Sequence, residues 1–311
     1  MPAAFLRSPA RGLWNLGPVP IRGYALVTVL GIIVGLWIAD RRYRKMGGQP
    51  GLILDIATLT VPVALIGSRL YSVITDYHQY FGDGRDLVNV LRIWDGGLGL
   101  PGGLAAGALA AWFWCRRAKV ALGPVAIAAT PALAFGQAVG SLGNWFAQRM
   151  YGRPSTLPWA VAIAPAHRVA GYESYATFQP VFLYESAWEL IVGLLVIWAI
   201  RRLLLTGDRA FALYAGLYAI GILCAEAVLV GPSPRLLGLR THQVVMIGVL
   251  AGAVAYLYLT RAKQGPEAVI PASGGSGAAT EGAGGPGING GAARDGAGRG
   301  RSVLSSARRS P

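Results

Sequence analysis

The segment GQAVGSLGNWFAQRMYGRPSTLPW, residues 136–159, decides the fold that we expect for this chain. It leaves an apolar run through Gly143, reaches Asn144, and then collects Arg149 and Arg153 before a proline-containing turn. Small residues let backbones approach closely in a membrane bundle, and polar residues at that depth are costly unless they serve a cavity or a partner. The segment therefore predicts an apolar helix that opens into a polar pocket at a membrane face. A tight glycine turn between two membrane helices is the simpler alternative.

The composition of the whole chain favours a membrane location. Of the 311 residues, 54% are hydrophobic and 14% are charged, and the mean hydropathy is positive. The formal net charge of +14 comes from Lys and Arg that cluster at the ends of apolar runs, where such residues set orientation and contact anionic lipid. We therefore expect an integral membrane protein with no nucleic-acid partner. Cys115 and Cys224 lie in apolar segments, so we expect both to be buried small hydrophobes.

Apolar segments of roughly the length that a bilayer core needs follow one another along the chain. Basic clusters follow every second segment, so they all lie on one side of a membrane, which the positive-inside tendency makes cytoplasmic. The predicted fold class is an all-α integral membrane protein with seven transmembrane helices, the N-terminus outside and the C-terminus cytoplasmic. The segments run over about 24–39, 52–74, 96–115, 120–139, 181–200, 210–230 and 244–259.

The chain divides into a membrane domain and a tail. Residues 1–263 hold the apolar segments and the polar loops between them, of which the loop over 144–179 is the longest. Residues 264–311 are rich in Gly and Ala and contain too little apolar surface to offset the entropy of ordering. We expect this tail to be disordered and cytoplasmic.

Charged residues inside or beside the apolar segments are the candidates for chemistry. Arg69, Glu185 and Glu226 lie within apolar segments, where a charged side chain pairs with a partner, reaches an interface or lines a cavity. Snorkelling of Arg69, or a structural pair between Arg69 and a glutamate, would also explain them. Five arginines lie in outer loops against the positive-inside tendency, which indicates either an anionic ligand or plain loop solvation. They are Arg149, Arg153, Arg168, Arg235 and Arg240. The three histidines show no metal-ligand spacing.

A series of motifs resembles, in the same order, those of prolipoprotein diacylglyceryl transferases. The resemblance implies seven transmembrane helices, no cofactor and no metal. It also implies transfer of the diacylglyceryl group of phosphatidylglycerol to the lipobox cysteine thiol in the signal peptide of a prolipoprotein, with release of glycerol phosphate. The location implied is the plasma membrane of a bacterium. The motifs are GPVPIRGYAL (17–26), LIGSRLYSVITDY (65–77), DGGLGLPGG (95–103), GSLGNWFAQRMYGRPSTLPW (140–159), TFQPVFLYES (177–186) and FALYAGLYAIGILCAEAVLVGPSPRLLGLR (211–240).

The chain departs from the family pattern on the side that holds the lipid phosphate. The family arginines fall at Ser141 and Leu229, the usual glutamate falls at Arg149, and a frequent histidine falls at Pro101. The retained positions are Arg22, Tyr24, Arg69, Gly97, Gly143, Asn144, Gly152, Arg153, Gln179, Pro180, Tyr184, Glu185 and Glu226.

The resemblance implies a role for each group of residues. Catalytic roles fall on Tyr24, Asn144 and Arg153, and contact with the lipid phosphate falls on Arg69, Ser141, Arg149 and Arg153. Supporting roles fall on Arg22, Gly143, Tyr184, Glu185 and Glu226.

Two other functions stay open from the sequence. The chain could be a catalytically weak or inactive paralogue that binds phospholipid or prolipoprotein and modulates an active member. A small transporter is the other alternative, but the sequence contains no internal repeat that would favour it.

Overall fold

The structure is a computed structural model, and the residues it describes are 6–9, 12–16, 19–75, 77–81, 87–90, 99–231, 235–236 and 238–262. The tail predicted over 264–311 lies outside the described residues, so the predicted domain division stays a prediction. Gly97, one of the retained family positions, also lies outside them.

Long helices dominate the described part, as the apolar segments predicted. They form where apolar runs are bounded by glycine, proline or clustered arginine. The seven long helices are α1 (Gly23–Lys45), α2 (Leu52–Thr75), α4 (Leu100–Arg117), α5 (Leu122–Ser141), α7 (Val181–Arg202), α8 (Gly207–Val228) and α9 (Thr241–Leu259).

Six of these helices are long and apolar enough to span a membrane, which identifies a membrane protein. The helix that falls outside this group is α4, which replaces the predicted segment 96–115; it has 18 residues, begins LPGG and ends in Arg116 and Arg117. Many large apolar side chains on the bundle are exposed, among them Ile33, Trp37 and Leu194. Exposed apolar side chains on long helices are what contact with lipid requires.

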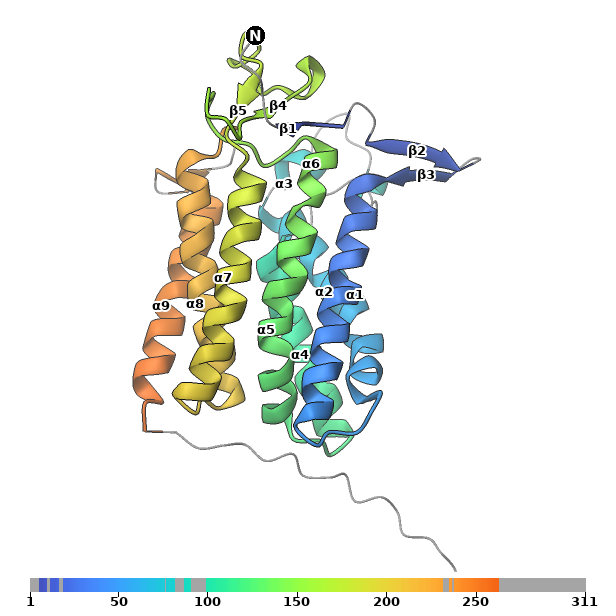
Figure 1. The fold of residues 1–311 in the computed structure, drawn as a ribbon, viewed down its shortest axis with the longest axis vertical. Coiled ribbons are helices and arrows are strands. Elements are labelled where there is room, and N and C mark those ends of the chain that lie inside the picture. Colours follow the sequence, from blue (N-terminus) through green and yellow to red (C-terminus); the bar gives the residue numbers. More distant parts are fainter. Residues whose placement is uncertain are drawn as a thin grey trace, which may run out of the picture. The chain divides into compact units, whose positions relative to one another are not determined.

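The helices pack side by side, with α1 along α5 and α2 along α4 (Figure 1). The first pair meets at two glycines. A Cβ atom at Gly31 would lie 2.5 Å from the carbonyl oxygen of Gly136, and one at Gly136 would lie 2.8 Å from that of Gly31. A side chain at either position would force the backbones apart, so this contact depends on glycine, as the membrane-packing argument expects.

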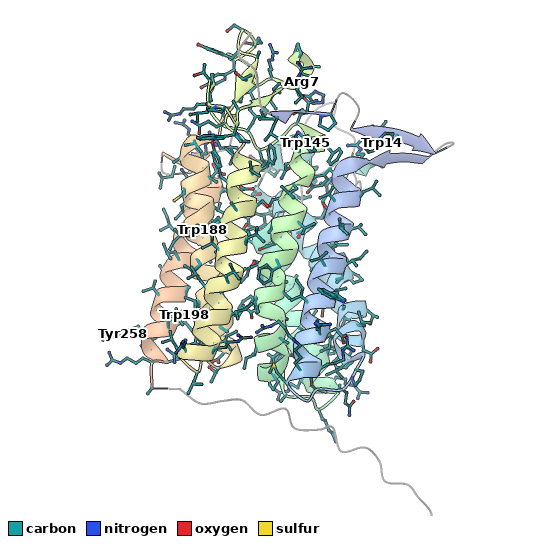
Figure 2. All side chains as sticks on the ribbon, viewed as in Figure 1. Arg7, Trp14, Trp145, Trp188, Trp198 and Tyr258 are labelled. Atoms are coloured by element: carbon teal, nitrogen blue, oxygen red, sulfur yellow. The ribbon has the colours of Figure 1, made fainter. Side chains whose placement is uncertain are left out.

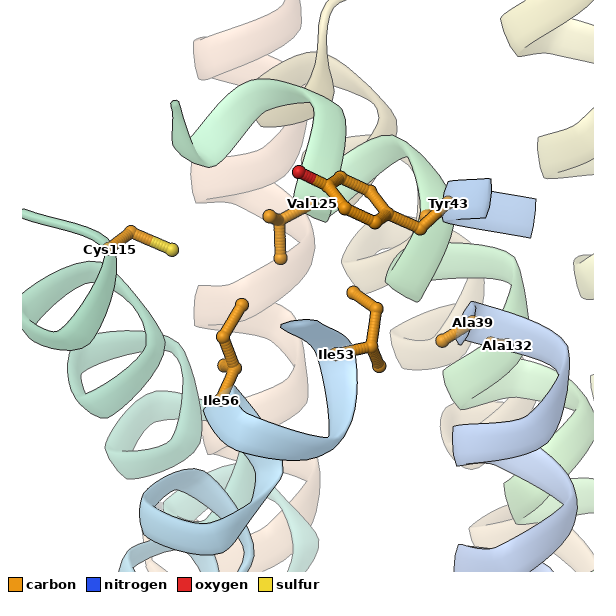
Figure 3. Packing of buried hydrophobic residues seen from close by; sticks show 8 residues of the cluster. Ala39, Tyr43, Ile53, Ile56, Cys115, Val125 and Ala132 are labelled. Atoms are coloured by element: carbon orange, nitrogen blue, oxygen red, sulfur yellow. The ribbon is translucent and has the colours of Figure 1, made fainter. Parts of the chain in front are cut away.

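An apolar cluster joins four helices at the end of the bundle where α1 finishes (Figure 3). Tyr43 of α1 and Ile56 of α2 are buried there beside Cys115 of α4 and Val125 of α5. Cys115 is 1% exposed, which confirms the prediction of a buried small hydrophobe, whereas Cys224 on α8 is exposed, so that prediction was wrong. We call this end, where basic residues lie in the last turns of α1, α4 and α7, the basic end.

The opposite end carries a folded cap in the region predicted as a long polar loop, 144–179. Strands β4 (Val161–Ala162) and β5 (Thr177–Phe178) are antiparallel, and β1 (Leu6–Arg7) runs parallel to β4 with Leu6 opposite Val161. Apolar side chains within the loop, including Tyr151, make this possible because they form a buried core of their own. We call this end of the bundle the cap end.

Several shorter elements complete the fold. The hairpin of β2 (Leu13–Leu16) and β3 (Val19–Arg22) leads into α1 and exposes Trp14, and Figure 2 labels both Trp14 and Arg7 at the cap end. The other short elements are α3 (Tyr77–Tyr80), the 3-10 helices η1 (Leu87–Val90) and η3 (Pro165–His167), α6 (Gly143–Ala147), and the hairpin of β6 (Arg235–Leu236) and β7 (Leu239–Arg240).

Candidate active site

Gly143 and Tyr24 meet where α6 packs against the first turn of α1, and three other predicted site residues lie within two positions of them in the chain. A Cβ atom at Gly143 would lie 3.1 Å from the carbonyl oxygen of Tyr24 and 3.2 Å from its ring. The absence of a side chain at Gly143 thus lets α6 approach Tyr24, and it carries Asn144 to the same place. The Asn144 amide nitrogen donates to the carbonyl oxygen of Ser141 at 3.2 Å. Arg22 flanks the start of α1 beside this group.

Arg69 is buried at the cap end of α2, with 7% of its surface exposed. Its Nε donates to the carbonyl oxygen of Val90 at 2.9 Å, and Nη1 donates to the Tyr80 hydroxyl at 3.1 Å. The guanidinium also lies 4.8 Å from the centre of the Tyr80 ring, a cation–π distance. Arg69 therefore reaches protein acceptors rather than snorkelling to an interface, and it holds the segment after α2 in place. Its predicted contact with a lipid phosphate stays a prediction.

Pro101 lies close to Arg69 in the fold. It occupies the first turn of α4, where proline is favoured because its missing N–H would have no partner in the helix. The N–H of Gly99, just before α4, donates to the carbonyl oxygen of Ser68 at 2.9 Å. This bond brings the start of α4 beside the residue that precedes Arg69.

Arg149 and Arg153 have exposed side chains in the cap. The backbone around Arg153 is nevertheless fixed, because its N–H donates to Val228 at 3.1 Å and its carbonyl oxygen accepts the Gln179 N–H at 3.0 Å. Gly152 forms an isolated bridge with Leu229. A rigid backbone thus presents the Arg153 guanidinium to the surroundings of the cap, and such a group can bind a phosphate oxygen pair in bidentate fashion.

Glu226 near the end of α8 has a partner that the sequence did not reveal. Arg240 Nη1 lies 2.9 Å from Glu226 Oε2, and both side chains are largely buried. Arg240 Nη2 also donates to the carbonyl oxygens of Leu229, at 3.0 Å, and Gly231, at 3.3 Å. The alternative in which Arg69 pairs with Glu226 is therefore wrong. The signal that could have found Arg240 is its place just before the last apolar segment, where it can reach back to a membrane carboxylate.

The guanidinium of Arg240 contacts the backbone of Leu229, which occupies a position where the family motif has an arginine. This cation contacts one carboxylate and two carbonyl oxygens, so it closes the cap end of α8 against the start of α9.

The remaining supporting residues lie on α7. The Tyr184 hydroxyl accepts a hydrogen bond from the Trp159 indole at 3.0 Å, which ties the cap to the first turn of α7. Glu185 is next in the chain, and its Oε1 is buried without a hydrogen-bond partner in the described part of the structure. Among the described residues there is no group of three or more His, Cys, Asp or Glu side chains that could hold a metal ion.

Comparison with known proteins identifies the family of this arrangement. The family model described as prolipoprotein diacylglyceryl transferase matches residues 11–259. A protein of Streptomyces avermitilis named phosphatidylglycerol–prolipoprotein diacylglyceryl transferase is 45% identical over 273 residues, which cover 87% of this chain and 79% of the relative. Two proteins of Streptomyces coelicolor with that name, numbered 1 and 2, are 45% and 42% identical and match 90% and 84% of this chain and 83% and 82% of their own lengths.

Proposed function

This chain belongs to the prolipoprotein diacylglyceryl transferase family, and we propose that it catalyses the transfer for which its relatives are named. It takes the diacylglyceryl group of phosphatidylglycerol and attaches it to the lipobox cysteine thiol of a prolipoprotein in a bacterial plasma membrane. The observation that carries this proposal is identity of 45% to a named transferase over 87% of the chain.

The reaction sets two requirements for the site. The thiol sulfur forms a bond to a glyceryl carbon, the bond from that carbon to the phosphate oxygen breaks, and the thiol proton passes to a base or to the leaving glycerol phosphate. The phosphate gains charge as it leaves, so it needs a cation or hydrogen-bond donors placed where that charge develops.

We assign the cations to Arg69, Arg149 and Arg153 and the polar wall to Tyr24 and Asn144. The fixed backbone of Arg153 and the close fit of Gly143 against Tyr24 support this assignment, because both hold the side chains at the cap end. Ser141 can donate a hydrogen bond but no charge. Loss of one charge-assisted contact at such a site costs about a hundred- to a thousandfold in rate.

The proposed topology has seven crossings, with α4 as the third. The basic clusters at the ends of α1, α4 and α7, together with Arg261 after α9, support a cytoplasmic basic end. The cap end then faces outward with the N-terminus, and the tail is cytoplasmic.

The test supplies purified full-length protein with phosphatidylglycerol and a lipobox peptide and measures the thioether product by mass spectrometry. We expect product, and expect Asn144→Ala and Arg153→Ala to lower its rate by about a hundredfold or more. Lack of product where a Streptomyces relative is active would refute the proposal.

The same assay addresses the inactive-paralogue alternative, which the names of the relatives do not favour. Ser141→Arg combined with Leu229→Arg restores both family arginines. Activity in this double variant alone would assign a binding role to the natural chain.

A further inference from the structure

A buried polar cluster lies between α5, α7 and α8, below the residues assigned above. Glu185 and Glu189 are one helical turn apart on α7, so they share a face. Glu189 is 4% exposed. Its Oε2 and the Oε1 of Glu185 are buried, and neither has a hydrogen-bond partner in the described part of the structure. Burial of a carboxylate oxygen without a partner is unfavourable in an apolar environment.

Gln137 on α5 completes the set with a donor. Its amide oxygen accepts a hydrogen bond from the Tyr214 hydroxyl of α8, while its amide nitrogen is buried and has no partner among the described residues. Tyr214 packs in one buried cluster with Val192, which lies one turn beyond Glu189 on the same face of α7. Tyr218, one turn further along α8, belongs to the same buried cluster.

A direct contact fixes α7 against α5 at this level. The Ser186 hydroxyl donates to the carbonyl oxygen of Ala138 at 2.8 Å, and these residues are the chain neighbours of Glu185 and Gln137. The level of α7 that carries Glu185 therefore packs against the level of α5 that carries Gln137.

Buried apolar side chains border the cluster on the side that faces the basic end. Val192 and Val196 continue the α7 face that carries Glu189, and both are completely buried together with Met246 of α9. At about 1.5 Å per residue, Glu185 and Glu189 lie about 6 and 12 Å below Val181, where α7 begins. The cluster therefore lies at a depth that a lipid head group drawn into the bundle from the cap end would reach.

We propose that this cluster binds the hydroxyl groups of a glycerol head group, with Glu185 and Glu189 as acceptors and Gln137 as donor. A glycerol moiety offers adjacent hydroxyls that both donate and accept, which matches the unpaired groups in kind. A site that is built to hydrogen-bond hydroxyls strongly rejects an analogue that lacks them, because its buried polar groups stay unpaired. The cluster thus selects phosphatidylglycerol among anionic lipids.

This inference rests on the proposed function for the identity of the lipid. The same hydroxyls are present in two molecules, the intact head group and the glycerol phosphate that leaves. The experiment distinguishes these two sources.

The test measures lipid retention by the full-length protein with native mass spectrometry. The probes are phosphatidylglycerol and phosphatidylpropanol, which carry the same phosphate charge and differ in the head-group hydroxyls. We expect the protein to prefer phosphatidylglycerol by about tenfold or more, a difference of about 1.4 kcal/mol per factor of ten. Competition by soluble glycerol phosphate, with inorganic phosphate as the control, would show that the released product binds as well.

Single substitutions test whether the cluster causes the preference for phosphatidylglycerol. Glu185→Gln and Glu189→Gln should each reduce the preference toward unity, because an amide is a weaker acceptor than a carboxylate and adds a donor. The matched control is Asp55→Asn, which makes the same change at an exposed position in the first turn of α2. It should keep the preference of the unmodified protein.

Equal retention of both lipids by the unmodified protein would overturn the proposal even if no variant folded. So would folded variants at Glu185 and Glu189 that both keep the original preference. Thioether product without a lipid preference would leave the transferase standing and remove the head-group site. A lipid preference without thioether product would support the head-group site and refute the transferase activity.

Discussion

At the scale of single residues, the arginines at the cap end fall into two classes. Arg69 and Arg240 are largely buried, and their guanidinium groups contact protein acceptors that lie near them in space. Arg149 and Arg153 are exposed and make no side-chain hydrogen bond or ion pair to the described residues. The exposed pair is therefore the better source of a cation for a ligand. The buried pair also holds segments together, so Arg69 is the most constrained of the three cations that we assign.

Tyr151 shows how a single side chain organises the cap. Its hydroxyl donates to the carbonyl oxygen of His167 at 2.7 Å and accepts the N–H of Val169 at 2.8 Å. Tyr151→Phe would leave both backbone groups without this partner, and we expect the cap to lose about 1–3 kcal/mol of stability. Hydrogen exchange at the Val169 amide measures the effect. Tyr175→Phe, on an exposed ring of the cap, is the control and should leave this exchange unchanged.

The same tyrosine predicts how the cap responds to alkaline pH. Burial raises the pKa of Tyr151 above its ordinary value of 10.0. The neutral phenol is therefore the form that stabilises the cap; its contribution is fully present below pH 10 and is lost as pH rises through the raised pKa. Above pH 10, exchange at Val169 should accelerate in the natural protein by more than hydroxide catalysis alone accounts for, whereas Tyr151→Phe should show only the hydroxide-catalysed rise. An identical alkaline profile in both proteins would contradict the assignment.

At the scale of helices, the contact between α1 and α5 depends on glycine at both surfaces. A methyl group at Gly31 would lie 2.5 Å from a backbone oxygen, which cannot move without its helix. We expect Gly31→Ala to cost about 1–3 kcal/mol, the range for overpacking. Denaturant unfolding in mixed micelles measures it.

Gly248 on α9 supplies the matched control for that substitution. A Cβ atom there meets nothing within 4 Å, so Gly248→Ala adds the same methyl group in open space. It should leave stability unchanged or raise it slightly, since alanine favours helix. Equal losses at both positions would show that the close approach is unimportant.

The helices could be predicted from the sequence because each depends on local features. The segment predicted over 181–200 is α7, Val181–Arg202, with an apolar run and two arginines that mark its end. The cap could not be predicted in this way, since Leu6 pairs with Val161 and no local pattern links them. The partner of Glu226 could not be predicted for the same reason. Its contact with Arg240 exists only because the end of α8 lies beside the start of α9.

The candidate site could be predicted only as separate residues. The segment that contains Gly143 and Asn144 predicted a polar opening, and the structure brings both to Tyr24. The buried donor on Gln137 was missed, because a lone glutamine in an apolar segment carries no signal until its neighbours across the bundle are known.

At the scale of the whole molecule, the distribution of charge predicts orientation. Cysteine labelling with a membrane-impermeant maleimide in intact cells tests it, in a background of Cys115→Ala and Cys224→Ala. Ser174→Cys, exposed in the cap, should react from outside, and Ala118→Cys, exposed just after α4, should react only after the cells are opened. Labelling of position 118 in intact cells would reverse the proposed topology or remove α4 from the spanning set.

The pairing of Leu6 with Val161 also sets an order of events while the protein is being made. At ~5–20 residues per second, the ribosome needs roughly eight to thirty seconds between these two positions. During that interval β1 has no strand to pair with and is open to chaperones and proteases. Nascent chains stalled before Val161 should therefore be cleaved near Leu6, while longer ones resist.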